Sequence, residues 1–145
     1  MMITRREAAL SLAALAEWFR SAEAGAHTQA SPQTPPRPPV FVQSLPNLTM
    51  EDWQVTVSIV DYAPGRVGTA HRHAGFVLAY VLEGSVVAKV SGQGDEKVYT
   101  AGQMFYEQPG ATHEVSKNAS ATVPAKLLAM IFAKKGATLT TIVGD

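Results

Sequence analysis

The chain has 145 residues, which is enough for one domain with its own hydrophobic core and too few for two ordinary domains. Lysine plus arginine number 12, as do aspartate plus glutamate, so charge gives no reason to expect nucleic acid or an anionic membrane as a partner. The absence of cysteine excludes disulfides, thiolate metal sites and a cysteine nucleophile. No apolar run reaches the roughly 18 residues that a membrane-spanning helix needs, so no membrane span is predicted.

Residues 1–26 have the features of an export signal. Arg5 and Arg6 supply a positive start, and a short apolar run and a small-x-small cleavage site follow them. The paired arginines resemble those of a twin-arginine signal, which predicts export to the periplasm. The alternative is a retained amphipathic helix in a cytoplasmic protein, because Thr4 and Glu7 match a capping box.

Residues 27–39 are predicted to form a linker. They include five prolines, which fix the backbone in an extended form and donate no amide hydrogen. His27 lies in this segment and is therefore not a candidate site residue. The folded domain is predicted to cover residues 40–145.

Short strands separated by turn residues fill this domain, and no helix of useful length is predicted in it. Residues 54–62 alternate, with Val55, Val57 and Ile59 on one face and polar side chains on the other, which is typical of a half-buried strand. Residues 76–82 are nearly all apolar, which predicts a strand buried on both faces. The remaining predicted strands are residues 40–42, 85–90, 97–100, 104–107, 113–116 and 126–133. This pattern indicates an all-β antiparallel sandwich or barrel.

Three histidines lie within the predicted barrel. His71 and His73 are two residues apart on one strand, so their side chains point to the same face. His113 follows a turn at the start of another strand and is the candidate for a third ligand. Two neighbouring imidazoles with a third from elsewhere form a typical metal-binding set.

The motifs around these histidines resemble those of the cupin family. The first cupin motif is matched by a glycine at position 65, by His71-Arg72-His73 and by Gly84. The second is matched by Gly102, Pro109-Gly110, His113 and Asn118, with the proline and the asparagine each displaced by one residue. The resemblance implies a jelly-roll β-barrel over residues 40–145. It also implies that His71, His73 and His113 bind one divalent metal ion.

The chain departs from the family at one ligand. The glutamate of the first motif falls on Val77, which cannot bind a metal. Three neutral imidazoles would leave a charge near +2 on a divalent ion, which favours anionic or chelating substrates. Glu107 is the best candidate for a general acid or base, since it lies nearest the predicted pocket mouth. Candidates to replace the lost glutamate as a ligand are Glu107, Gln108, Glu114, Tyr80 and Tyr106, and each of them is expected to be a surface or rim residue rather than a ligand.

The resemblance implies a metal-dependent cupin for small molecules, and the three-histidine pattern resembles that of dioxygenases that use iron(II). The favoured prediction is an oxidoreductase of dioxygenase type acting on an enolisable or chelating substrate, with Fe(II) as the metal; Mn, Zn, Ni and Cu also suit imidazole ligands. A lyase or isomerase that uses a redox-inert metal is an alternative. A second alternative is a binding module that captures a ligand or metal without turnover. The resemblance also implies a homodimer, with residues 40–44 adding to a partner's sheet edge.

Overall fold

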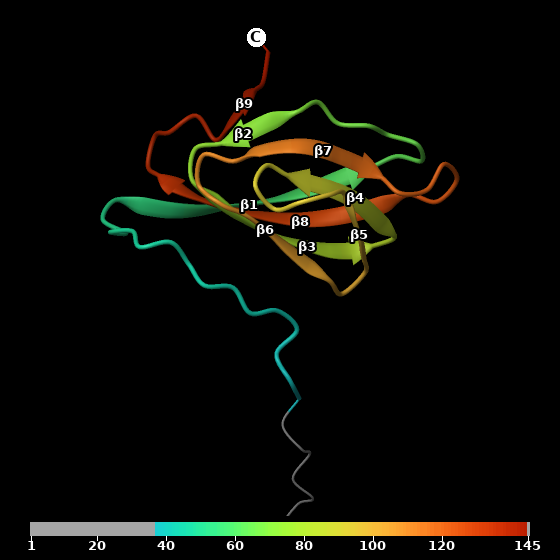
Figure 1. Cartoon of the computed structure of the whole chain (residues 1–145), viewed down its shortest axis with the longest axis horizontal. Coiled ribbons are helices and arrows are strands. Elements are labelled where there is room, and N and C mark those ends of the chain that lie inside the picture. The colour runs from blue at the N-terminus through green and yellow to red at the C-terminus, as the bar shows by residue number, and fades with distance from the viewer. Residues whose placement is uncertain (1–36, 145) are drawn as a thin grey trace, which may run out of the picture. The chain divides into compact units, whose positions relative to one another are not determined.

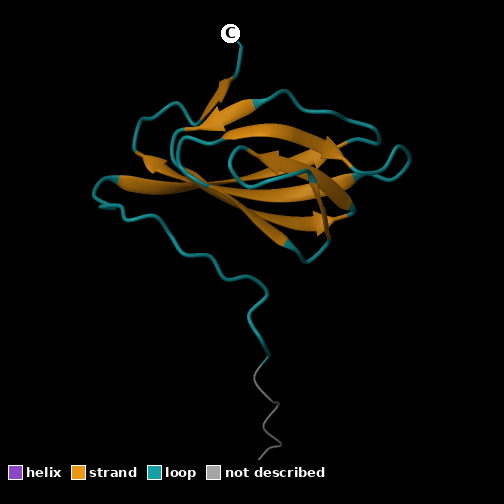
Figure 2. Cartoon of the chain, viewed as in Figure 1, coloured by secondary structure: helices purple, strands orange, loops and turns teal. Residues whose placement is uncertain are grey.

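The computed structural model describes residues 37–144, and the predicted signal at residues 1–26 and most of the linker lie outside this range. The described part contains nine strands and no helix, and thus no helix that could cross a membrane (Figure 2). The strands are β1 (Trp53–Tyr62), β2 (His71–His73), β3 (Phe76–Glu83), β4 (Ser85–Val90), β5 (Lys97–Thr100), β6 (Met104–Glu107), β7 (Thr112–Asn118), β8 (Ala125–Lys134) and β9 (Thr140–Ile142).

The strands form two antiparallel sheets that face each other (Figure 1). One sheet has the order β1-β8-β3-β6, and the other has the order β5-β4-β7-β2-β9. Strands that are distant in the chain are therefore neighbours in each sheet, as in a jelly roll. This arrangement confirms the all-β jelly-roll barrel predicted from the sequence.

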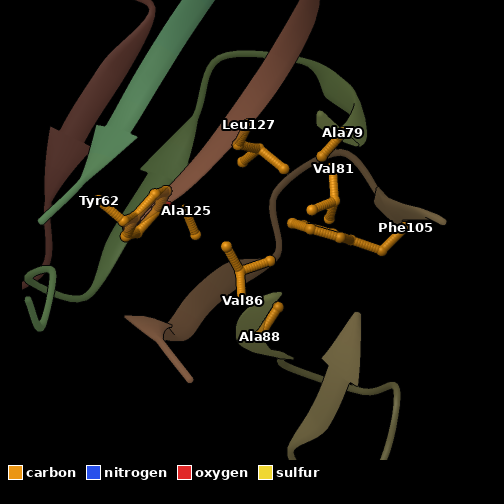
Figure 3. Packing of buried hydrophobic residues seen from close by; sticks show 8 residues of the cluster. All are labelled: Tyr62, Ala79, Val81, Val86, Ala88, Phe105, Ala125 and Leu127. Carbon is orange, nitrogen blue, oxygen red and sulfur yellow. The ribbon is translucent and has the colours of Figure 1, made fainter. Parts of the chain in front are cut away.

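The packed core lies between the two sheets. The four-stranded sheet contributes apolar side chains that include Val81 and Leu127, and these meet Val86 and Ala88 of the other sheet (Figure 3). The full cluster is Tyr62, Ala79, Val81, Val86, Ala88, Phe105, Ala125 and Leu127. Along β3, Val81 packs in this cluster, whereas Val77 lines a cavity. The interior is therefore solid around Val81 and hollow around Val77.

The alternation along β1 is confirmed, but its apolar face points away from the barrel. Val55, Val57 and Ile59 are 50%, 54% and 52% exposed, whereas Val60 and Tyr62 on the opposite face line the cavity. The exposed valines and isoleucine continue an apolar surface across β8 and β3. We call this surface the outer apolar face, and it comprises Val55, Val57, Ile59, Leu78, Tyr80, Leu128 and Met130.

Two strand predictions need correction, and one observed strand was not predicted. Residues 40–42 form no strand, and Val40 and Val42 are 74% and 78% exposed, because no neighbouring strand pairs with this segment in the described structure. Strand β3 is not buried on both faces, since Leu78 and Tyr80 on its outer side are only partly covered. Strand β9 has no apolar alternation, and it forms by pairing with β2.

We expect Gly75→Ala to destabilise the protein by about 3 kcal/mol, the upper range for overpacking. Gly75 lies between β2 and β3. A Cβ atom there would be 1.9 Å from the backbone oxygen of Phe132 on β8, so the segment around Gly75 would have to move away from β8. Urea denaturation measures the change. The control is Gly110→Ala, where a Cβ meets nothing within 4 Å and only the backbone φ of 75° is unfavourable. Equal losses in both variants would contradict the prediction.

Candidate metal and ligand site

A cavity of about 400 Å³ lies between the two sheets, which is a suitable size for a small organic ligand. The four-stranded sheet supplies a mainly apolar wall, to which Val77, Leu127 and Ile131 belong. The five-stranded sheet supplies the imidazoles opposite it. The polar side chains that line the cavity are Ser58, Tyr62, Arg66, Thr69, His71, His73, Glu107, His113, Ser116 and Thr140.

The structure brings the three predicted histidines together. His71 and His73 are the two ends of β2, and His113 on β7 is the direct register partner of His71. The ring centroid of His71 lies 4.9 Å from that of His73 and 5.0 Å from that of His113. The local spacing of two and the pairing of β2 with β7 together place three neighbouring imidazoles in the lining of the cavity.

The hydrogen bonds of His71 and His73 leave one nitrogen of each ring free. Nδ1 of His71 donates to the carbonyl oxygen of Thr69 at 2.8 Å, and Nδ1 of His73 donates to that of Leu139 at 3.0 Å. A carbonyl oxygen can only accept, so each Nδ1 carries the proton and each Nε2 keeps its lone pair. Nε2 of His113 is buried without a hydrogen-bond partner. Metal-binding histidines have this arrangement, with the second ring nitrogen held by a carbonyl or carboxylate.

The spacing of the rings fits a shared ion. Two imidazoles bound to one ion hold their ring centroids roughly 4.5–5.5 Å apart when the metal–nitrogen bond is about 2.1 Å. Both measured separations fall inside that interval. In residues 37–144 no group of three or more His, Asp or Glu side chains is already arranged so that it could hold a metal ion. Binding an ion here therefore requires side-chain adjustment, while the strands already place the rings at a suitable distance.

A bulge in β7 explains the displaced asparagine of the second motif. Between the pairs Lys89↔Val115 and Val90↔His113, β7 advances two residues while β4 advances one. The extra residue lets both His113 and Asn118 be buried, although five positions separate them in the chain. Asn118 Nδ2 donates to the carbonyl oxygens of Tyr62, Ala63 and Val123. The asparagine therefore ties β7 to the ends of other strands and does not line the cavity.

Glu107 is the one carboxylate that lines the cavity, and its predicted place at the pocket mouth is wrong. It is the last residue of β6 and only 5% exposed. Its Oε1 atom lies 3.1 Å from Nδ1 of His113, and its Oε2 atom lies 3.8 Å from Nε2 of His73. The other candidates are absent from the cavity lining: Gln108, Glu114, Tyr80 and Tyr106. Glu114 is exposed and pairs with Lys89 instead.

Burial lowers the pKa of His73, and the nearby Glu107 carboxylate only partly opposes this effect. In the unfolded chain a histidine has a pKa of about 6.5, so below that pH the unfolded state binds more protons than the folded one. Neutral His73 therefore stabilises the fold above about pH 6.5, and this contribution is lost as the pH falls through the lower folded-state pKa. At neutral pH the ring is uncharged and its Nε2 can bind a metal.

We expect the metal-free protein to lose stability as the pH falls below about 6.5, and His73→Asn to lose less of it, because the variant has no buried imidazole to protonate. Urea midpoints at pH 7.5 and pH 5.0 measure both changes. Arg72→Asn is the control, since Arg72 lies between the two histidines, is exposed and bonds Thr112 on the other side of the strand. If His73→Asn lost as much stability between pH 7.5 and pH 5.0 as the wild type, protonation of His73 would not be the cause of that loss.

Sequence reasoning missed a polar pair in the cavity wall. The Tyr62 hydroxyl and the Ser116 hydroxyl are 2.6 Å apart and buried, and burial raises the pKa of Tyr62. The guanidinium of exposed Arg66 lies 5.1 Å from the centre of the Tyr62 ring. The alternation of β1 puts Ser58, Val60 and Tyr62 on one face of the strand. The sequence does not show that this face is the internal one, so it did not identify Tyr62 as a cavity residue. Arg66 gives the cavity a cation besides any bound metal.

The fold and the cavity define a jelly-roll barrel whose internal cavity is lined by a cluster of three histidines. The family model described as cupin domain, Cupin_2, matches residues 58–131, which is 74 of the 145 residues. The chain belongs to the cupin family. A search of curated proteins gave no match.

Solved structures share this fold. A double-stranded β-helix protein from Klebsiella pneumoniae is 20% identical, with 63% of this chain and 76% of that chain covered and a TM-score of 0.51. An oxalate oxidase is 24% identical, with 61% and 46% covered and a TM-score of 0.53. The DMSP lyase DddQ from Ruegeria pomeroyi is 15% identical, with 61% and 43% covered and a TM-score of 0.53. The chain thus spans less than half of the oxidase and lyase chains, and at these identities the similarities show a common fold alone.

Proposed function

We propose that this cupin binds one divalent metal ion through His71, His73 and His113 and acts on a small organic substrate. The observation that supports the site is that each of the three rings has an Nε2 atom without a hydrogen bond. Backbone carbonyls hold Nδ1 of His71 and His73, and Nε2 of His113 is buried without a partner. Leaving such a nitrogen unpaired inside a protein costs about 1–3 kcal/mol, which a metal bond would offset.

The reaction class we favour is oxidation of dioxygenase type, with Fe(II) as the preferred metal. A bound divalent ion would supply Lewis acidity and, if redox-active, electron transfer. The chain itself supplies an apolar wall that excludes water around Val77 and Ile131. Exposed Arg66 at the cavity can attract and orient the negative end of a substrate. An enolisable or chelating small molecule suits these surroundings.

A lyase or isomerase reaction with a redox-inert metal is the second candidate. The buried Glu107 carboxylate favours it, because removal of a proton next to a carbonyl group needs a base within the cavity. The proteins of similar fold named above include both an oxidase and a lyase, so the fold accommodates either chemistry. A binding module without turnover is the third candidate.

Metal analysis and oxygen uptake distinguish these functions. Protein purified without chelators is expected to contain about one equivalent of Fe, Mn, Ni, Cu or Zn per chain. Oxygen consumption on a panel of diketones, catechols and flavonols would support a dioxygenase. Product formation without oxygen consumption would support a lyase or isomerase, and a loaded protein without turnover would support a binding module. Protein that holds no metal, and takes up none when Fe(II) or Mn(II) is added, would overturn the proposal.

We also propose that the protein is a homodimer that buries the outer apolar face. Contiguous exposed apolar surface on a folded chain is typical of an interface. The three exposed β1 side chains lie beside β8, and partly covered side chains of β8 and β3 continue the surface. Residues 40–44, which pair with no strand within residues 37–144 of their own chain, remain a second proposed contact at the partner's sheet edge.

A further inference from the structure

The structure places a carboxylate close to the position where this chain lacks the glutamate of the first cupin motif. Val77, which stands at the position of the motif's glutamate, is the direct register partner of Glu107 on the neighbouring strand β6. Residues directly opposite each other in an antiparallel pair project to the same face, with Cβ atoms about 4.5–5.5 Å apart. A carboxylate from position 107 therefore enters the same part of the cavity that a glutamate at position 77 would enter.

We propose that Glu107 is the fourth protein ligand of the metal centre and replaces, from β6, the motif glutamate lost at Val77. This inference rests on the proposed site of His71, His73 and His113. It assigns Glu107 a place on the metal in addition to, or instead of, the acid–base role predicted from sequence.

The distances support a shared ion. Glu107 Oε2 lies 3.8 Å from Nε2 of His73, which is the free nitrogen of that ring. Two ligands on one ion with bonds of about 2.1 Å lie roughly 3.0–3.8 Å apart, for angles between about 90° and 130°. The other oxygen, Oε1, lies 3.1 Å from Nδ1 of His113, which is the ring nitrogen that does not face the ion when Nε2 binds it. Oε2 is therefore placed to share an ion with Nε2 of His73, while Oε1 holds the second ring nitrogen of His113.

The burial of Glu107 supports the same role. Its side chain is 7% exposed, and its close charged or titratable partners are the imidazoles of His73 and His113. In residues 37–144 no lysine or arginine forms an ion pair with it, whereas Glu83, Glu96 and Glu114 each pair with a lysine. A buried carboxylate without a cation is costly, and a divalent ion would neutralise it.

This ligand changes the expected substrate preference. Three imidazoles leave a charge near +2 on the ion, whereas three imidazoles and one carboxylate leave about +1. The attraction for an anionic substrate is correspondingly smaller, and Arg66 at the cavity carries more of it. The centre therefore suits a neutral or singly charged chelating molecule better than the three-histidine set would.

Exchanging the two residues tests the proposal. Mn(II) binding is measured by electron paramagnetic resonance titration on the full-length protein and on Glu107→Gln, Glu107→Val and the double variant Val77→Glu/Glu107→Val. We expect both single variants to bind Mn(II) at least roughly 100-fold more weakly. Loss of a residue that only hydrogen-bonds a metal ligand typically costs about 10–100-fold in affinity, so a larger loss indicates a direct ligand. We expect the double variant to recover to within about tenfold of the original affinity, because its carboxylate returns to the same part of the cavity.

The control is Glu114→Gln, which removes an exposed carboxylate next to His113 and is expected to leave Mn(II) binding unchanged. Binding by Glu107→Gln that is weakened less than about 100-fold would overturn the proposal, because loss of an outer partner already gives about 10–100-fold. This nearly isosteric variant decides the matter if the double variant does not fold. A folded double variant that binds no better than Glu107→Val would also overturn it. If wild type fails to bind Mn(II), or His71→Ala binds it equally well, the three-histidine site itself is wrong.

Discussion

His71→Ala is expected to abolish stoichiometric metal binding and the stabilisation that the metal provides. His71 is next to both other histidines, with ring centroids 4.9 Å and 5.0 Å away, so its loss opens the centre of the cluster. Loss of a partner in the outer shell typically costs about 10–100-fold in affinity, and loss of a direct ligand should cost more. Metal present at 100 times its dissociation constant stabilises a folded protein by about 2.7 kcal/mol.

Differential scanning fluorimetry with and without added metal measures this effect. For a domain of this size, about 2.7 kcal/mol corresponds to a rise in Tm of roughly 10 °C or more in the wild type. We expect no rise in His71→Ala and a normal rise in Arg72→Ala, whose side chain bonds Thr112 away from the cluster. Metal retained by His71→Ala with an undiminished rise in Tm would exclude His71 as a ligand.

Val57→Glu is expected to convert the proposed dimer into a monomer. Val57 is 54% exposed in the single chain, and it pairs with Met130, which in turn neighbours Leu78. In a two-fold symmetric interface the substitution enters twice, so two carboxylates would be buried without a partner. An uncompensated charge at an interface costs about 2–5 kcal/mol, so the dissociation constant should rise by a factor of about 30 or more.

Light scattering coupled to size-exclusion chromatography, over a range of concentrations, measures the oligomeric state. The matched control is Val98→Glu, which places the same charge at a valine that is 58% exposed on the edge strand β5 of the other sheet. We expect that control to remain dimeric. A wild-type protein that is monomeric at high concentration, or a Val57→Glu variant that stays dimeric, would contradict the use of the outer apolar face.

Much of the fold was predictable because its signals are local. Alternation along residues 54–62 predicted β1 within one residue, and turn residues marked the ends of β4, β5 and β6 at the positions observed. The spacing of His71 and His73 places both rings on one face of any strand, whatever the rest of the chain does. Residues 40–42 were mispredicted because β propensity alone does not form a strand without a partner.

The candidate site depended more on tertiary structure. Alternation shows that a strand has two different faces, but only packing shows which face is internal, and β1 turns its apolar face outward. Strand β9 has no hydrophobic pattern of its own, yet it provides Thr140, whose hydroxyl oxygen lies 3.2 Å from Nδ1 of His73. The bulge in β7 likewise appears only in the register with β4.

The sequence by itself determined the class of the protein and the identity of its histidine cluster. These follow from period-two spacing, turn residues and two motifs, which are properties of short stretches of chain. Only the tertiary structure decided which of the candidate carboxylates lies beside that cluster. Val77 and Glu107 are 30 positions apart in the chain, and they become neighbours because β3 and β6 pair in one particular register. Register depends on the packing of whole strands, so no local pattern around either residue specifies it.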